Sequence, residues 1–210
     1  MQELMKKLQP DRDAFAADPF GYAALAWQRW AIALELAGEP IDSLRPPTTE
    51  DLKSPLLWLS QAHALSEAAV TVLRADPKVE HLPLLTRGVC DSQYRAVGLM
   101  LVGYSLEMCL KGMLILEKGV QLYSAEEKSH KHHRLVELAE LVPSLNEKDK
   151  AILQLLTEFV YWAGRYPDPG SGREDNLEAI FSVSERHQIA AKDLFGLASK
   201  VMQHAAVLTA

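Results

Sequence analysis

The sequence predicts an all-α protein. Apolar residues recur at helical spacing along most of the chain, glycines and prolines separate these stretches, and the alternation typical of strands is nearly absent. The chain has 210 residues, of which 48% are apolar and 24% charged, the composition of a globular domain that can bury a core. We therefore expect a single all-α domain over residues 1–210, folded as a helical bundle of about six helices.

Two helices are expected in the first part of the chain. The Ala- and Leu-rich stretch 20–37 follows an Asp-Pro start signal and stops at Gly38. Ser54 can cap a second helix that has Pro55 at its first position and runs to about residue 75. Prolines and polar residues between the two indicate a loop.

A long helix over about residues 92–118 is expected to form the centre of the bundle. It follows a connection at 76–86 that contains two prolines, and Gly119 closes it. At 1.5 Å per residue such a helix is about 40 Å long.

The apolar run in this helix is long enough to cross a membrane, but its charges argue against a span. Only Glu107 and Lys111 are charged between residues 96 and 116. Each would cost about 2.5 to 3.5 kcal/mol at the centre of a bilayer, and no second span accompanies it. We expect a buried central helix and no membrane partner.

The remainder of the chain predicts three more helices. Asn146 can cap one of them, and Pro143 ends the helix before it. The segment RYPDPGSGRED, residues 165–175, is a loop by composition. The expected helices cover residues 134–142, 147–164 and about 184–208.

Charge and cysteine content restrict the function classes. The net charge of −6 argues against attraction of the whole surface to nucleic acid, so an RNA partner would have to meet a local patch. Cys90 and Cys109 are too few for a disulfide framework, and the N-terminal MQELMKKLQPDRD lacks the uninterrupted apolar segment typical of a signal peptide. We expect a cytoplasmic protein.

Glu107 and Lys111 lie four residues apart, in the favourable order for a helical ion pair. Two readings stay open: the polar stripe that they form faces water, or Glu107 reaches a cation from another helix inside a partly buried network. Catalysis is a third, smaller alternative.

Three histidines, His130, His132 and His133, crowd one polar segment, with Glu137 one turn after His133. A His and a Glu four apart on a helix can share a metal ion, but no further ligand has a suitable spacing. We expect His133 to cap or pack at the start of the next helix, and we expect no metal site.

Arg165 and Tyr166 close the helix that ends in WAGRYP. The Arg165 guanidinium can bind the last helix carbonyls, pair with a buried carboxylate such as Glu107, or face a phosphate. Nucleophile, Walker and dinucleotide motifs are absent from the sequence, so we expect no cofactor.

Three motifs in sequence order, GYSLEMCLKGMLI, HHRLVELAE and WAGRYP, resemble those of the HEPN superfamily of small helical bundles. The resemblance covers Val89 to the C-terminus. It makes residues 89–208 a HEPN-like core, with residues 1–85 as an N-terminal helical extension packed on it. The matching positions are Glu107, Lys111, His133, Leu135, Leu138, Arg165, Tyr166 and Pro167.

The resemblance implies a bundle that dimerises and that is tied to RNA, since many members resemble or are metal-independent ribonucleases. In that chemistry an Arg stabilises the phosphate charge, and a His separated from it by four to six residues transfers protons. This sequence departs from the pattern, because Gly, Ser and Gly follow Arg165 at those offsets. The one formal match, Arg74 with His81, has the frequency of a chance pair and falls outside the resembling region.

Three functions are consistent with these residues. The first is a non-catalytic or divergent HEPN-like homodimer that binds RNA, a nucleotide or a protein partner in a bacterial defence or toxin–antitoxin setting. Its site is a cleft lined by Lys111, His133, Arg165 and Tyr166, with Glu107 facing Arg165. The second is an active ribonuclease with His133 and Arg165 as catalytic residues, and the third is a structural helical interaction module.

Overall fold

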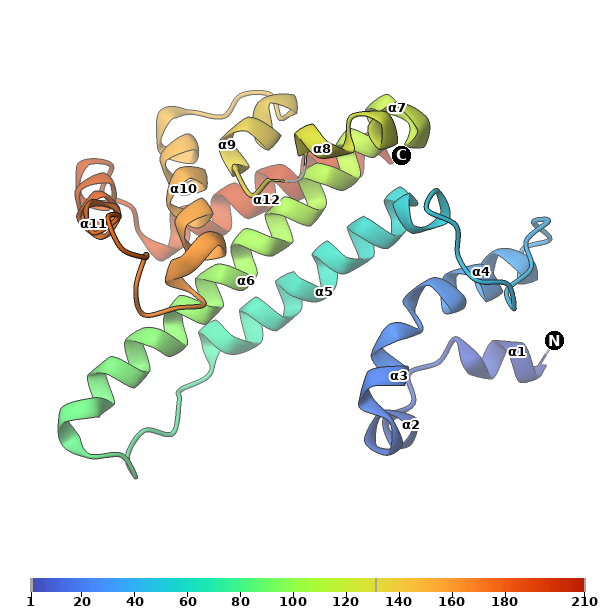
Figure 1. The fold of residues 1–210 in the computed structure, drawn as a ribbon, viewed down its shortest axis with the longest axis horizontal. Helices are drawn as coiled ribbons and strands as arrows, with labels where there is room; N and C mark the ends of the chain where they lie inside the picture. Colours follow the sequence, from blue (N-terminus) through green and yellow to red (C-terminus); the bar gives the residue numbers. More distant parts are fainter. Residues whose placement is uncertain (1, 131, 210) are drawn as a thin grey trace. The chain divides into compact units, whose positions relative to one another are not determined.

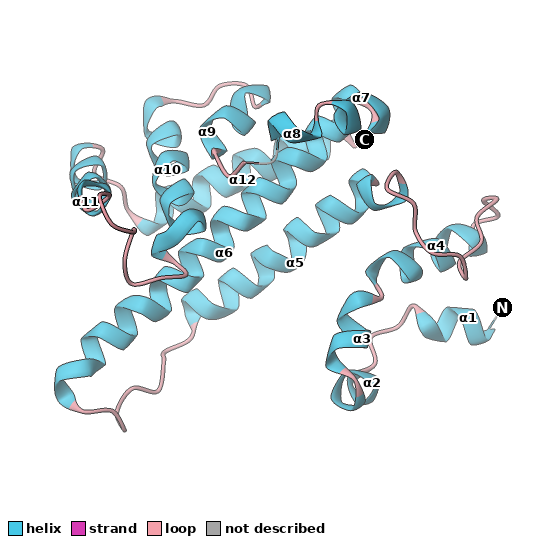
Figure 2. Ribbon diagram, viewed as in Figure 1, coloured by secondary structure: helices cyan, strands magenta, loops and turns pink. Residues whose placement is uncertain are grey.

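The structure is a computed structural model that describes residues 2–130 and 132–209. These residues form α-helices, short 3₁₀ turns and loops and contain no strand, so the predicted all-α class is confirmed (Figure 2). The chain divides into two compact units, Met1–Leu57 and Trp58–Ala210. Residues 58–85 therefore belong to the second unit. The predicted single domain, with residues 1–85 packed on 89–208, stays a prediction.

The first unit contains four short helices and a 3₁₀ turn. The Asp18 side chain accepts a hydrogen bond from the Gly21 N–H and starts a helix with Pro19 at its first position. The predicted helix 20–37 is two helices, because the chain breaks at Leu25. The elements are α1 (Gln2–Lys7), α2 (Arg12–Ala17), α3 (Pro19–Ala24), α4 (Ala26–Leu36) and η1 (Asp51–Lys53).

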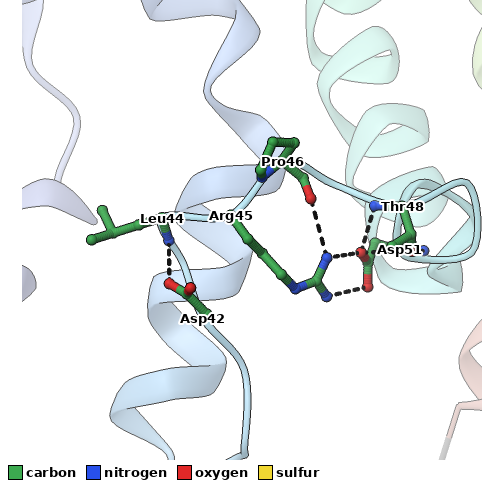
Figure 3. A network of polar contacts seen from close by, with 6 residues as sticks. All are labelled: Asp42, Leu44, Arg45, Pro46, Thr48 and Asp51. Carbon is green, nitrogen blue, oxygen red and sulfur yellow. Dashed lines mark hydrogen bonds and ion pairs between the residues drawn. The ribbon is translucent and has the colours of Figure 1, made fainter.

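The loop between α4 and η1 is held by one carboxylate (Figure 3). Asp51 accepts two hydrogen bonds from the Arg45 guanidinium, at 2.6 and 3.0 Å. It also accepts from the backbone N–H and the hydroxyl of Thr48, both at 2.7 Å. The Arg45 guanidinium lies 5.5 Å from the centre of the buried Trp27 ring, so the network ties this loop to α4.

The second unit is built around one long helix. Figure 1 shows α6 running the length of the unit, with α5 on one side and α9, α10 and α12 on the other. The elements are α5 (Pro55–Arg74), α6 (Leu84–Lys118), α7 (Val120–Ala125), α8 (Glu127–His130), α9 (Leu135–Leu138), η2 (Ala139–Leu141), α10 (Glu147–Glu158), the π-helix η3 (Phe159–Ala163), α11 (Asp175–Arg186) and α12 (Ala191–Leu208).

The predicted central helix is confirmed in α6, with an earlier start. It begins at Leu84, and Arg87 donates hydrogen bonds to the carbonyls of Leu82 and Glu80, which extends the ordered helix back to the connection. Gly119, with φ 78°, ends it as expected.

Among the described residues α6 is the one helix long and apolar enough to cross a membrane. In that apolar stretch 61% of the residues are buried inside the protein, which agrees with the expected core helix.

Glycines let two neighbours approach α6 closely. A Cβ at Gly103 would lie 2.5 Å from Val160 Cγ2, and a Cβ at Gly98 would lie 2.5 Å from a methyl group of Leu73 on α5. The buried Ser105 hydroxyl donates to the Ala62 carbonyl of α5 at 2.8 Å. These contacts fix α5 and η3 against α6.

The helix predicted over 147–164 is confirmed in position, but its end is a π-helix. The Asn146 side chain accepts a hydrogen bond from the Asp149 N–H and caps α10, and the Asp149 side chain accepts one from the Asn146 N–H, which completes a capping box. The last turns, Phe159–Ala163, are wound as the π-helix η3. Sequence periodicity does not distinguish this winding from an α-helix.

The predicted helix 184–208 is confirmed in α12, which begins later, at Ala191, whereas α11 was not predicted apart from its last three residues. The chain reverses at Gln188, which adopts a φ of 47°. Asp193 then accepts a hydrogen bond from the Ala190 N–H at the start of α12. The predicted helix 134–142 is split into α9 and η2, with α9 only four residues long.

The predicted number of helices is too low. Twelve α-helices occur in the described residues instead of about six, because short segments such as α7 and α8 add one turn or two each.

Candidate polar site around Glu107

Glu107 and Lys111 are buried on the inner face of α6. Their exposed fractions are 1% and 7%, and the Lys111 Nζ lies 2.7 Å from Glu107 Oε1. The reading in which this stripe faces water is therefore wrong. Removing both charges from water is costly, so the pair requires good mutual geometry and further hydrogen bonds.

His133 supplies the second partner of the Glu107 carboxylate. Its Nδ1 lies 2.8 Å from Glu107 Oε2, and the residue sits in the segment between α8 and α9. The buried network of the second reading is present, but the additional partner of Glu107 is a histidine from a loop segment and not a cation from another helix. Because a carboxylate oxygen accepts hydrogen bonds, Nδ1 is the nitrogen that donates, and Nε2 is left for another partner.

Two tyrosines flank the His133 ring. Tyr104 of α6 and Tyr161 of η3 both meet it edge-on, with ring centres 6.0 and 5.5 Å away. Two residues after His133, the backbone N–H of Leu135 donates to the Thr157 hydroxyl of α10, which anchors the segment. The expected packing role of His133 is confirmed, and its side chain remains 36% exposed.

Arg165 does not face Glu107, so the predicted pairing is wrong. Both Glu107 oxygens are occupied by Lys111 and His133 inside the unit, whereas Arg165 lies just beyond η3 on the surface. Its Nη2 donates to the Tyr166 hydroxyl at 3.3 Å, and its guanidinium lies 5.2 Å from the centre of the Tyr166 ring. Both residues are exposed, and their backbone N–H groups bond the Trp162 carbonyl.

The structure therefore brings together three of the five predicted site residues. Glu107, Lys111 and His133 form one connected network, and Arg165 with Tyr166 forms a separate exposed pair. A cleft lined by Lys111, His133, Arg165 and Tyr166 stays a prediction.

The other two histidines of the polar segment have their own carboxylate partners. His130 lies 3.4 Å from Glu126 and stacks on the buried Tyr123 ring. Burial raises the pKa of Tyr123 to about 12, with smaller contributions from nearby carboxylates. The Lys118 ammonium, followed by His130, lowers the pKa of Glu126.

Glu137 pairs with His132, at 3.6 Å, and with Arg134, at 2.8 Å, and not with His133. Burial and the neighbouring Arg134 charge lower the pKa of His132. Within residues 2–130 and 132–209, no group of three or more His, Cys, Asp or Glu side chains could hold a metal ion.

Tyr161 is the residue of this site that the sequence did not reveal. Its 49% exposure places it at the surface beside His133. Its only local signal is a polar ring inside an otherwise apolar helix end, and the π winding of η3 that orients it is a tertiary effect.

The arrangement has a clear chemical capability. A buried carboxylate that accepts from one imidazole nitrogen fixes the tautomer and the orientation of the ring. The other nitrogen can then bind a polar ligand or transfer a proton.

Comparison with protein-family models, with curated proteins and with solved structures finds no match to this chain in any of the three.

Proposed function

We propose that this chain is a HEPN-like helical bundle protein that binds single-stranded RNA at the surface around His133. In this proposal it acts as a homodimer in the bacterial cytoplasm, in a defence or toxin–antitoxin setting, and recognises RNA without cleaving it. The setting and the dimer rest on the resemblance of the three sequence motifs to the HEPN superfamily.

The observation that carries the proposal is the fixed, partly exposed His133 imidazole beside an exposed tyrosine. Its position is set by the buried Glu107, and Tyr161 stands next to it with half of its surface in solvent. Unstacked RNA bases bind on aromatic rings, and imidazole or guanidinium groups reach their phosphates and edges.

The exposed pair formed by Arg165 and Tyr166 adds a second such element. Arg165 follows Tyr161 by four residues and has no carboxylate partner among the described residues. A guanidinium already placed over a tyrosine ring is preorganised both for stacking and for a phosphate contact. Because the net charge is −6, RNA has to meet a local patch of the surface, and this pair offers one.

A ribonuclease is the second candidate, and the Glu107–His133 hydrogen bond favours it. In this reaction His133 Nε2 takes the proton of an RNA 2′-hydroxyl, whose oxygen attacks the adjacent phosphorus. The bond to the 5′-oxygen breaks, that oxygen receives a proton, and a cyclic phosphate remains. Arg165 would stabilise the phosphate charge, which requires both residues to reach one phosphate.

Binding and cleavage of a fluorescently labelled, unstructured RNA test both functions. The proteins are the wild type, His133→Ala and Arg165→Ala, with His81→Ala and Arg173→Ala as exposed controls of the same residue types. We expect the two site variants to bind about tenfold more weakly, the range of one lost stacking or phosphate contact, and the controls to bind as the wild type does.

Cleavage in the same samples separates the two candidates. An intact RNA with all five proteins supports binding without catalysis, whereas a product that disappears in both site variants establishes the ribonuclease. Equal absence of binding and cleavage in all five proteins overturns both and leaves the purely structural module.

A further inference from the structure

A cavity of about 640 Å³ lies in the second unit, away from His133. Five helices contribute to its wall, among them α5 with Leu73, α6 with Leu99, α11 with Ile180 and α12 with Leu194, and Phe159 of η3 also lines it. Of these helices, α10 and α11 lie at the left of the second unit in Figure 1. The volume lies within the range of small-molecule sites, about 300 to 1,000 Å³.

One side of the cavity is formed by α11, which is itself only partly buried. None of the residues of α11 is buried, and its Leu177 and Phe181 are 48% and 66% exposed. Protein interiors rarely leave a void much larger than a water molecule, so side chains of a tightly packed α11 would have filled this space. A ligand with an apolar body can fill it instead.

The wall is almost wholly apolar, and its polar side chains are Arg74 and Ser184. Arg74 stands in the last turn of α5, is exposed to solvent, and also lines the cavity. Arg74 is therefore a residue at the rim of the cavity, and it is the one cationic residue among those that line it. An apolar interior with one cation at its opening is complementary to a molecule that has an apolar chain and one anionic end.

Arg74 is available for such a ligand because a different arginine, Arg95, binds the carbonyls at the end of α5. Arg95 of α6 donates to the carbonyls of Leu73 and Ala75 at the end of α5, at 3.0 and 2.8 Å, and pairs with Asp76. Across residues 2–130 and 132–209, Arg74 has no hydrogen-bond or ion-pair partner.

We propose that this cavity binds a single-chain amphiphilic anion, a fatty acid or an alkyl phosphate. The chain lies among the apolar side chains of α5, α6, α10, α11 and α12, and the anionic head pairs with Arg74. The proposal is independent of RNA binding, because none of the five predicted RNA-site residues lines the cavity.

Calorimetric titration of the full chain with dodecanoate, dodecyl phosphate and dodecanol, all below their aggregation concentrations, tests the proposal. We expect 1:1 binding of both anions and about tenfold weaker binding of the neutral alcohol. Among shorter carboxylates, each methylene removed should weaken binding about fourfold where the chain is buried. The relative affinities of carboxylate and phosphate show which head group the site prefers.

Two variants and one control identify the site. Arg74→Gln should reduce the affinity for both anions to that for dodecanol, and Ser184→Phe should weaken binding of all three ligands by occupying part of the cavity. Arg173→Gln, an exposed arginine outside the cavity, should bind as the wild type does. Circular dichroism and thermal unfolding check that each variant is folded.

The proposal is overturned if no amphiphile binds, or if Arg74→Gln binds the anions as tightly as the wild type. It is also overturned if sedimentation shows a dimer that Ser184→Phe converts to a monomer, because a second copy of the chain then covers the cavity. If the wild-type protein binds RNA but no amphiphile, the cavity proposal is refuted and the RNA proposal is not.

Discussion

Glu107 binds two partners with one buried carboxylate, Lys111 from its own helix and His133 from a loop. The sequence identified all three residues, because a charge inside an apolar helix is conspicuous. It indicated the pair of Glu107 with Lys111, but it did not identify His133 as the second partner of Glu107. Partner choice depends on which loop and helix end reach the middle of α6, and no local spacing encodes that.

Replacing Glu107 with Gln should destabilise the second unit by about 3 to 5 kcal/mol, because it leaves the Lys111 charge buried without a counter-charge. Urea unfolding measures this change in the free energy of unfolding. Glu117→Gln, an exposed carboxylate of the same helix, is the control and should change stability by less than about 0.5 kcal/mol. Equal stability of the two variants would contradict the buried network.

Asp51 gives the first unit a pH-dependent contact. Hydrogen bonds from Arg45, and then from Thr48, hold the pKa of Asp51 well below its ordinary value of 3.8. As pH falls below 3.8 the unfolded chain takes up this proton before the folded chain does, so the contact's contribution is full above 3.8 and is lost as pH decreases toward the folded pKa.

The expected result is that wild type is more stable than Asp51→Asn at pH 6 and that the difference shrinks steadily below pH 3.8. Urea unfolding, monitored by the amide NMR signals of Leu44 and Thr48, reports on this loop. A difference that stays constant down to pH 2 would show that the Asp51 charge does not support the fold.

At the scale of elements, close approach to α6 is decided by its glycines. Only the structure shows that Gly103 meets η3 and that Gly88 meets nothing within 4 Å. Helix ends were predicted where a capping residue was present, as at Asn146 and Gly119, and were missed where an uncapped turn interrupts a periodic stretch, as at Leu25.

Two glycine-to-alanine changes in α6 should have opposite effects. Gly103→Ala should destabilise by about 1 to 3 kcal/mol, because the added Cβ overlaps Val160 and lies 3.2 Å from the Leu156 carbonyl. Gly88→Ala, on an exposed part of the same helix, should stabilise by about 0.5 to 1 kcal/mol by restricting the unfolded chain. Thermal and urea unfolding of both variants provide the comparison, and a shift of the same sign in both would contradict it.

In the second unit as a whole, the core concentrates on the middle of α6. Leu106, Leu110 and Met113 are fully buried there. Two ion pairs fasten α12 to the neighbourhood of α10, Lys200 with the buried Asp149 at 2.6 Å and Lys148 with Asp193 at 3.0 Å. By contrast α11 contributes no buried residue, which leaves it as the least stabilised long helix of the unit.

Native-state hydrogen exchange should reflect this contrast. We expect the amides of Leu106, Leu110 and Met113 to exchange only through global unfolding, and those of α11 to exchange orders of magnitude faster through local opening. Exchange in α11 as slow as that in α6 would refute the loose packing of α11. Dodecanoate should slow exchange in α11 if it fills that cavity.

The sequence by itself determined the all-α class, the long apolar helix at the centre of the second unit, its end at Gly119, the cap at Asn146, and the set of polar residues worth examining. These features are local, since periodicity, capping and composition act within a few residues of each position. Only the tertiary structure decided the pairing of Glu107 with His133 instead of Arg165, the π winding that presents Tyr161, and the cavity beside Arg74. Each of these depends on contacts between residues far apart in the chain, where burial and steric fit, and not spacing, select the partner.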